Sequence, residues 1–170
     1  MLVLRAAIIA CLSLLLVQCS SGPKTWVYNY QDGKTSMLLN SQAVPQANIP
    51  RKVQLAVTAG NKIHGKPYRY GGGHAKFEDK GYDCSGTVSY VLHEAGLLSE
   101  PTTSGEFRRF GKSGEGKWLT VYAKDGHAFI VVAGLRLDTS SGSGDSERGP
   151  RWTTHPRSIR GFRARHPEGL

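Results

Sequence analysis

The chain is poor in cysteine, in acidic residues and in long apolar runs, and each shortage limits the classes of protein to which it can belong. Its 170 residues include 3 cysteines and 13 acidic against 22 basic side chains, for a net charge of +9. One apolar run, at the N-terminus, approaches membrane length, so a multi-pass membrane protein is excluded. The excess of basic residues excludes an acidic solvating tail and favours an anionic partner: nucleic acid, a membrane face or a polymer. The length allows one modest domain with tails but not two independent cores.

The N-terminus has the pattern of an export signal. Arg5 precedes an almost wholly apolar stretch at residues 6–17, and polar, turn-forming residues follow from Gln18. The stretch is shorter than the roughly 20 residues that span a membrane, but it suits a secretory signal. Its end resembles a bacterial lipoprotein signal, which implies a signal peptide over residues 1–18 and lipidation of Cys19. An uncleaved anchor and a plain secreted form are the alternatives.

Export would leave one thiol in the mature domain. Cys11 falls inside the signal, Cys19 would carry lipid, and Cys84 remains. Exported domains normally pair their cysteines in disulfides, so a lone cysteine requires another explanation. Cys84 is either an inert buried thiol that behaves as a small hydrophobe, or a nucleophile.

The residues around Cys84 predict a helix that begins at the cysteine. Asp83 is a suitable N-cap, and Gly96 is a suitable residue to end the helix. Between them, one apolar stripe has helical spacing: Val88, Val91, Leu92 and Ala95. Unpaired N–H groups and the positive end of the helix dipole favour an ionised thiolate at this position.

A nucleophilic cysteine needs a base, and the base needs an orienting partner. His127 is the best candidate base because it lies at the start of the most apolar expected strand. His93 lies nine residues along the helix from Cys84, about 13–14 Å away, and cannot reach the thiol. If Ala133-Gly134 is a two-residue turn, Asp138 and His127 share a face, with roughly 7–8 Å between their backbones. Asp138 could otherwise be an ordinary strand-end residue, and His155 is the reserve orienting residue.

The order of the elements predicts an α+β fold with helices packed on an antiparallel sheet. The periodicity indicates a helix over about 51–64 and strands over 117–123, 128–132 and 135–139. Residues 20–49 are polar and turn-rich, which is typical of a linker with one short strand near Trp26–Tyr30.

Three motifs carry a family resemblance: Tyr68-Arg69-Tyr70-Gly71-Gly72, Asp83-Cys84-Ser85-Gly86 and Gly126-His127 before an apolar strand. With them, residues from about 48 to 170 resemble the NlpC-type cysteine peptidases. These are papain-like, exported bacterial enzymes that cut the stem peptides of the cell wall. The resemblance implies a division into a signal peptide (1–18), a linker or N-terminal extension (19–49) and a peptidase domain (50–170).

The resemblance also implies roles for individual residues. Cys84 would be the nucleophile, His127 the base and Asp138 the third member, at a position where the family often has histidine. Tyr68 would help bind the oxyanion, while Asp83 and Ser85 would contact the free amine end of the substrate. No cofactor is implied.

Two other kinds of site are excluded by spacing. The segment 111–117 nearly fits a phosphate-binding loop, but Trp118 stands where a magnesium-binding hydroxyl is needed. A zinc site needs three or four ligands in compact spacing, and Cys84 and the scattered histidines offer no such cluster. The sequence therefore predicts no metal.

The C-terminal segment is rich in arginine: Arg148, Arg151, Arg157, Arg160, Arg163 and Arg165. A segment of this kind forms either a solvated surface or a contact with anionic envelope polymer or lipid. An exported protein rarely meets nucleic acid, so nucleic acid is the less favoured partner. The sequence thus predicts a monomeric envelope peptidase acting on peptidoglycan stem peptides. A non-catalytic envelope-binding lipoprotein with a degenerate cleft, and a related amidase or acyltransferase, are the alternatives.

Overall fold

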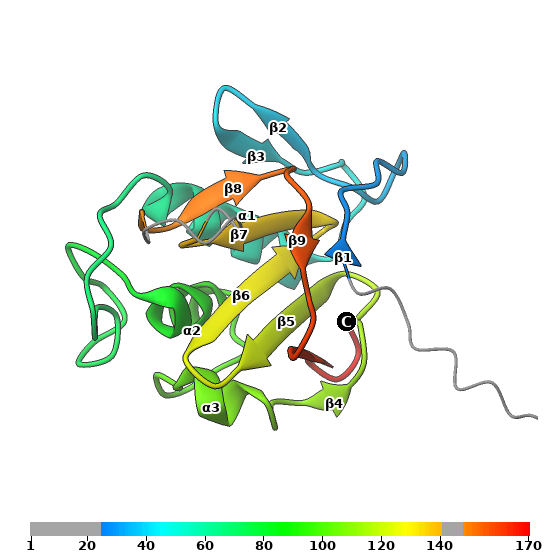
Figure 1. The fold of residues 1–170 in the computed structure, drawn as a ribbon. Coiled ribbons are helices and arrows are strands. Elements are labelled where there is room, and N and C mark those ends of the chain that lie inside the picture. Colours follow the sequence, from blue (N-terminus) through cyan, green and yellow to red (C-terminus); the bar gives the residue numbers. More distant parts are fainter. Residues whose placement is uncertain (1–24, 141–147) are drawn as a thin grey trace, which may run out of the picture.

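The structure of the protein is a computed structural model, and it describes residues 25–140 and 148–170. Within these residues the helices are α1 (Arg51–Ile63), α2 (Cys84–Glu94) and α3 (Ser104–Phe107) (Figure 1). The strands are β1 (Thr25–Trp26), β2 (Met37–Leu39), β3 (Gln42–Val44), β4 (Lys112–Ser113), β5 (Leu119–Lys124), β6 (His127–Val132), β7 (Leu135–Asp138), β8 (Arg151–Thr153), β9 (Arg157–Ser158) and β10 (Arg163–His166). The expected α+β class is confirmed.

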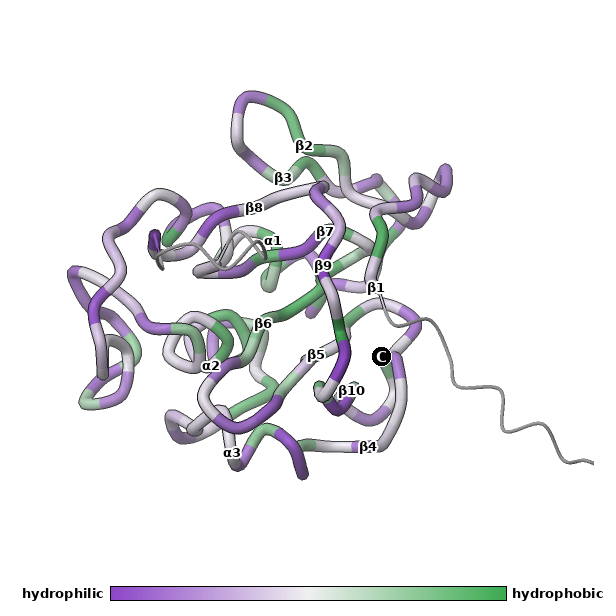
Figure 2. The backbone as a smooth tube through the Cα atoms, viewed as in Figure 1, coloured by the Kyte–Doolittle hydropathy of each residue, from purple (hydrophilic) through white to green (hydrophobic). Residues whose placement is uncertain are grey.

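Six of the strands form one antiparallel sheet in the order β4-β10-β5-β6-β7-β8. Its central strands β5, β6 and β7 are joined by short hairpins and are almost completely buried. Figure 2 shows the strongly apolar stretch of β6 running through the middle of the molecule. These three strands are the ones expected from the sequence, and their ends differ from the expected ends by at most two residues.

The two faces of the sheet contribute to separate apolar cores. The larger core packs against α1 and α2 and takes alternate residues of β6: Ala128, Ile130 and Val132. Phe129 and Val131 point to the other face, where they pack with Trp26 of β1. Because β1 pairs with β9, a two-stranded ribbon covers the sheet face opposite the helices (Figure 1).

The helix that positions the candidate nucleophile begins where the sequence predicts. The carboxylate of Asp83 accepts a hydrogen bond from the backbone N–H of Gly86 at 2.7 Å, as an N-cap does. The chain leaves the helix at Gly96, which has a φ of 66°. The other expected helix is α1, which follows Pro50 and packs against α2.

Both ends of the described chain pack on the sheet and helices. Residues 25–49, expected as a linker or N-terminal extension, include β1 and the β2–β3 hairpin and bury Trp26 and Ile49. The arginine-rich end forms β8, β9 and β10, which the sequence analysis did not predict. These strands have only two to four residues each and carry few apolar side chains, so they lack the apolar run from which β6 was predicted.

No helix within residues 25–140 and 148–170 is both long and apolar enough to cross a membrane. The expected signal peptide at residues 1–18 and the expected lipidation site at Cys19 lie outside the described residues. Both stay predictions.

Candidate active site

Cys84 is the first residue of α2, and its side chain lies beside the turn that precedes β6. The distance from Sγ to the carbonyl oxygen of Gly126 is 4.0 Å. The residue is 7% exposed and lines a cleft. At this position the N–H groups of the first helical turn and the positive end of the helix dipole stabilise a negative charge.

The turn between β6 and β7 determines which side chains share a face of the sheet. Val132 pairs with Leu135 across Ala133-Gly134, and both turn residues have positive φ, 44° and 73°. These values are typical of a two-residue type I′ turn, so the register expected from the sequence is confirmed. As a result His127 and Asp138 lie on one face, with 2.9 Å between His127 Nε2 and Asp138 Oδ1.

The imidazole of His127 interacts with the side chains of both Asp138 and Cys84. Burial by itself lowers the pKa of His127, but the hydrogen bonds and charges of its two partners outweigh burial and raise the pKa to about 9. Because Nε2 bonds Asp138, Nδ1 is the ring nitrogen that remains for the thiol. The imidazole is therefore protonated at neutral pH, the form that can donate a proton to a leaving amine.

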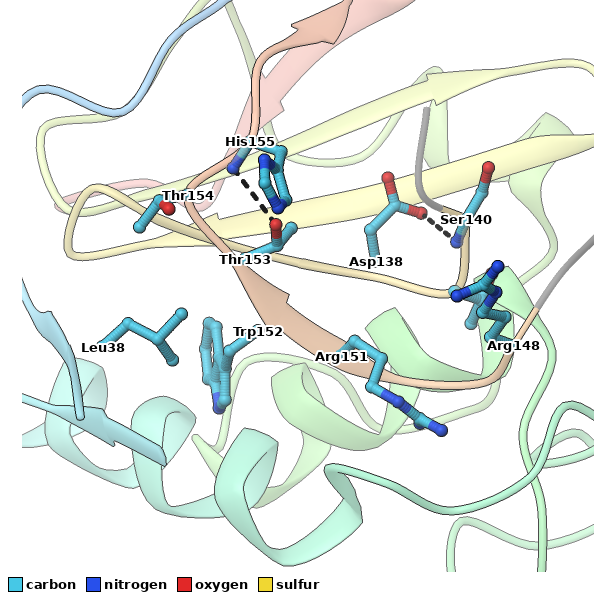
Figure 3. Close-up of a pocket in the computed structure, with 10 residues that line it drawn as sticks. Leu38, Asp138, Ser140, Arg148, Arg151, Trp152, Thr153, Thr154 and His155 are labelled. Carbon is cyan, nitrogen blue, oxygen red and sulfur yellow. Dashed lines mark hydrogen bonds between the residues drawn. The ribbon is translucent and has the colours of Figure 1, made fainter. Parts of the chain in front are cut away.

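Asp138 is ionised although its side chain is completely buried. Burial opposes ionisation, but His127, Arg136 and Arg157 outweigh it and hold the pKa of Asp138 below its ordinary value. Arg136 donates a hydrogen bond to Oδ2, and Arg157 Nε lies 3.7 Å from the same oxygen. The backbone N–H of Ser140 donates to Oδ1 at 3.1 Å (Figure 3).

Arg136 is a site residue that the sequence analysis overlooked. It lies two residues before Asp138 on the same strand, so the two side chains share a face. The available signal was a basic residue between Leu135 and Leu137 in a strand expected to be buried, because a buried charge requires a partner.

Asp138 also borders a second cavity, with a volume of about 290 Å³ (Figure 3). His155, the reserve orienting residue, lines this cavity and is exposed, and its backbone N–H donates to Thr153 Oγ1 at 3.1 Å. The carboxylate of Asp138, and not the His155 ring, is therefore the partner that the structure brings to His127.

A cleft of about 320 Å³ opens at Cys84. The loop at residues 68–74, the start of α2 and the residues around the start of α3 contribute to its walls. Tyr68, Asp83 and Ser85, the residues expected to contact substrate, all line this cleft. The structure thus brings the expected substrate-contacting residues together with the thiol.

His74 is a cleft residue that the sequence analysis treated only as a loop-end histidine. Its Nε2 lies 3.1 Å from Asp83 Oδ1 and 3.1 Å from Ser85 Oγ, and the side chain is 25% exposed. His74 is therefore bonded to both residues expected at the amine end of the substrate. Its position directly after the glycine run at residues 71–73 was the signal that could have revealed it.

The arrangement is suited to nucleophilic acyl transfer. A thiol, an imidazole and a carboxylate lie in series, with the thiol at the start of a helix and at a cleft. Among residues 25–140 and 148–170, no three His, Cys, Asp or Glu side chains are grouped so that they could hold a metal ion.

The segment that holds the thiol and the histidine is similar to a known family. The NlpC/P60 family model matches residues 65–128, a range that contains Cys84 and His127. The peptidoglycan hydrolase RipB from Mycobacterium tuberculosis is 19% identical, with 71% of this chain and 69% of that chain covered and a TM-score of 0.51. An NlpC/P60 family protein from Bacillus cereus is 18% identical, with coverage of 82% and 52% and a TM-score of 0.52.

At these identities the two solved structures show a shared fold, and the chain spans about half the length of the Bacillus cereus protein. No curated protein matched the chain. The segment that holds the thiol and the histidine therefore matches the NlpC/P60 family model, and the chain shares its α+β fold with the two solved structures.

Proposed function

We propose that the protein is a peptidoglycan hydrolase, and more specifically a cysteine peptidase that cleaves peptide bonds in cell-wall stem peptides. The observation that carries the proposal is the series formed by Cys84, His127 and Asp138, in which Cys84 lines the cleft. The match of residues 65–128 to the NlpC/P60 family model supports the substrate class, as does the name of RipB as a peptidoglycan hydrolase.

The reaction begins with attack by the Cys84 thiolate on a peptide carbonyl. The backbone N–H of Cys84 and the hydroxyl of Tyr68 bind the oxyanion that forms, an interaction worth about 3–4 kcal/mol in other enzymes. Protonated His127 then donates its proton to the leaving amine, which leaves a thioester on the sulfur. Neutral His127 next takes a proton from water as water attacks the thioester. The C–S bond then breaks, which releases the carboxylic acid product and returns the Cys84 thiolate beside protonated His127, and Asp138 holds the imidazole throughout.

Asp83 and Ser85 contact the free amine end of the substrate in this proposal. Both line the cleft next to the thiol, and they also bond each other, with 3.3 Å between Ser85 Oγ and Asp83 Oδ1. Asp83 has a structural task as well, because its carboxylate accepts hydrogen bonds from the backbone N–H groups of Gly71 and Gly86. A substitution there would affect both the fold and the substrate.

The proposal includes a location at the cell envelope, with export by the N-terminal signal and anchoring through lipid on Cys19. A single acyl chain holds a membrane only marginally, so a basic surface would strengthen the attachment. Arg160 and Arg163 are exposed and available to anionic lipid or wall polymer. Arg165 is instead part of the fold, because its guanidinium donates to the carbonyl oxygen of Phe110.

Mass spectrometry of defined stem peptides after incubation with the purified chain tests the proposal. The wild-type protein should produce two fragments from one peptide bond. Cys84→Ala and His127→Ala should produce none while keeping the wild-type circular dichroism spectrum. His93→Ala is the matched control, because His93 stacks on Phe77 with 3.7 Å between ring centroids and does not line the cleft.

Two results would contradict the proposal. Hydrolysis that survives Cys84→Ala would show that another group is the nucleophile. A wild-type protein that is folded and has a reactive Cys84, yet cuts no stem peptide, would show that the substrate or the reaction is different.

A further inference from the structure

Arg136 is the largest fully buried side chain in the described part of the chain. Its guanidinium donates to Asp138 Oδ2 and to the carbonyl oxygens of His155, at 3.3 Å, and Ser140, at 3.5 Å. Removing a charge from water is costly, so a buried guanidinium persists only where partners compensate it. The described partners fix the guanidinium beside the carboxylate that bonds His127.

Two aromatic rings enclose this guanidinium. The central carbon of the Arg136 guanidinium lies 5.5 Å from the ring centre of Trp26 and 5.8 Å from that of Phe129. Aromatic rings suit a planar cation because their faces carry partial negative charge. Phe129 belongs to the sheet, but Trp26 belongs to β1, so the N-terminal strand helps to exclude water from the buried pair.

The charged groups that face Asp138 come from several elements. His127 approaches from β6, Arg136 from β7 and Arg157 from β9, and Cys84 lies beyond His127 at the start of α2. Arg151 pairs with Asp138 through the β7–β8 ladder, but its guanidinium donates to the carbonyl oxygens of Lys66 and Pro150. The cations next to the carboxylate oppose its protonation, which burial alone would favour.

We propose that Arg136 is a positioning residue of the reaction. It keeps the Asp138 carboxylate ionised and directed at His127, and Trp26 of the N-terminal strand closes the site in which it does so. Residues 25–26 are then part of the active-site structure and not only a connection to the export signal. This inference rests on the proposed function, but the alkylation of Cys84 tests it without peptidase activity.

The test measures the alkylation rate of Cys84 by iodoacetamide as a function of pH. Mass spectrometry of the peptide that contains Cys84 follows the reaction on the full purified chain, and stem-peptide hydrolysis is measured over the same pH range. In each profile the acid limb is the range over which the rate rises with increasing pH. Arg136→Met should move this limb to higher pH by about one unit, because loss of a neighbouring cation raises the pKa of the Asp138 carboxyl by roughly that amount or more. Arg136→Lys keeps the charge, so its acid limb should stay in place while its hydrolysis rate falls.

Arg51→Met is the matched control. It removes an arginine that is exposed at the start of α1, and it should leave both profiles unchanged. A double-mutant cycle then tests whether Arg136 acts through Asp138. In an Asp138→Asn background, Arg136→Met should add no further shift of the acid limb, because the carboxylate on which the guanidinium acts has been removed.

Trp26 is tested in the same way. Trp26→Ala opens the buried pair to water, so it should move the acid limb in the same direction as Arg136→Met but by less. Trp26→Phe should restore most of the wild-type profile. Tyr30→Ala removes an exposed ring from the same N-terminal extension and should have no effect on either profile.

A purely structural role predicts a different result. If Arg136→Met lowers the unfolding midpoint but leaves the acid limb of the folded protein at its wild-type pH, the proposal is wrong. If Arg136→Met does not fold, Trp26→Ala provides the test. Alkylation and hydrolysis profiles of Trp26→Ala that match the wild type would then show that the proposal is wrong. A wild-type protein whose Cys84 is alkylated but which cleaves no stem peptide would refute the proposed function. The alkylation test of Arg136 would still be valid in that case.

Discussion

Gly86 of α2 packs directly against the backbone of Gly72, and a Cβ at residue 86 would overlap the Gly72 carbonyl oxygen. The same oxygen accepts a hydrogen bond from the backbone N–H of Asp83 at 3.3 Å. The motif that begins at Tyr68 and the motif that begins at Asp83 therefore meet backbone to backbone. This contact determines where Cys84 stands relative to the loop that forms the opposite wall of the cleft.

Gly86→Ala should therefore destabilise the protein, although alanine is the better helix former by about 1 kcal/mol. Forcing a methyl group into this contact should cost roughly 1–3 kcal/mol, more than the gain in helix propensity. It should also displace Cys84 and reduce hydrolysis by about 10-fold or more. Urea unfolding and the stem-peptide assay measure the two effects.

Gly105→Ala is the control for this change. Gly105 is also helical, but its Cβ would meet its nearest neighbour at 3.8 Å, an ordinary contact. The control should keep wild-type stability and activity. Equal stability of the two alanine variants would show that the backbone contact between Gly86 and Gly72 does not constrain the helix.

His74→Ala should weaken substrate binding more than it slows the chemical step. His74 bonds Asp83 and Ser85 in the cleft wall but has no described contact with Cys84 or His127. Its loss should raise KM by about 3- to 10-fold, as expected when a hydrogen bond worth 0.5–1.5 kcal/mol is removed, and leave kcat within about twofold. Steady-state kinetics on one stem peptide measure both constants.

The control for this prediction is Glu94→Gln at the end of α2. Glu94 is exposed and does not line the cleft, so the change should leave KM unchanged. A His74→Ala variant with normal KM and a reduced kcat would instead place His74 in the chemical step.

The parts of the site that depend on short-range relations along the chain could be predicted from the sequence. Capping by Asp83 places Cys84 at the start of a helix, and a two-residue turn gives His127 and Asp138 a common face. Each of these relations spans a short stretch of chain, in which periodicity and turn geometry fix the outcome. For that reason α2, β6 and β7 lie where they were expected.

The parts that were missed depend on contacts between distant segments. Trp26 reaches Arg136 only because β1 pairs with β9 and crosses the sheet, and neither short strand has an alternating pattern. The sequence pattern therefore indicates a linker or N-terminal extension over residues 19–49, and a solvated or envelope-contacting segment around Arg157. Arg157 instead lies against Asp138 and Phe129.

Protonation of His127 should link the stability of the fold to pH. Its pKa is about 9 in the folded protein and about 6.5 in an unfolded chain, so the folded state binds the proton more tightly. The resulting stabilisation is fully present below pH 6.5 and is lost as the pH rises through 9. Its size is on the order of 3 kcal/mol, from 1.36 kcal/mol for each unit of pKa difference.

Urea unfolding of the wild type and of His127→Gln at pH 6, 7.5 and 9 measures this linkage. The free energy of unfolding of the wild type should fall across this range relative to that of the variant, because glutamine does not titrate. Taking the difference between the two proteins removes the contribution of every group that titrates equally in both. Parallel curves would mean that folding does not raise the proton affinity of His127, and Asp138 could then not be holding an imidazolium.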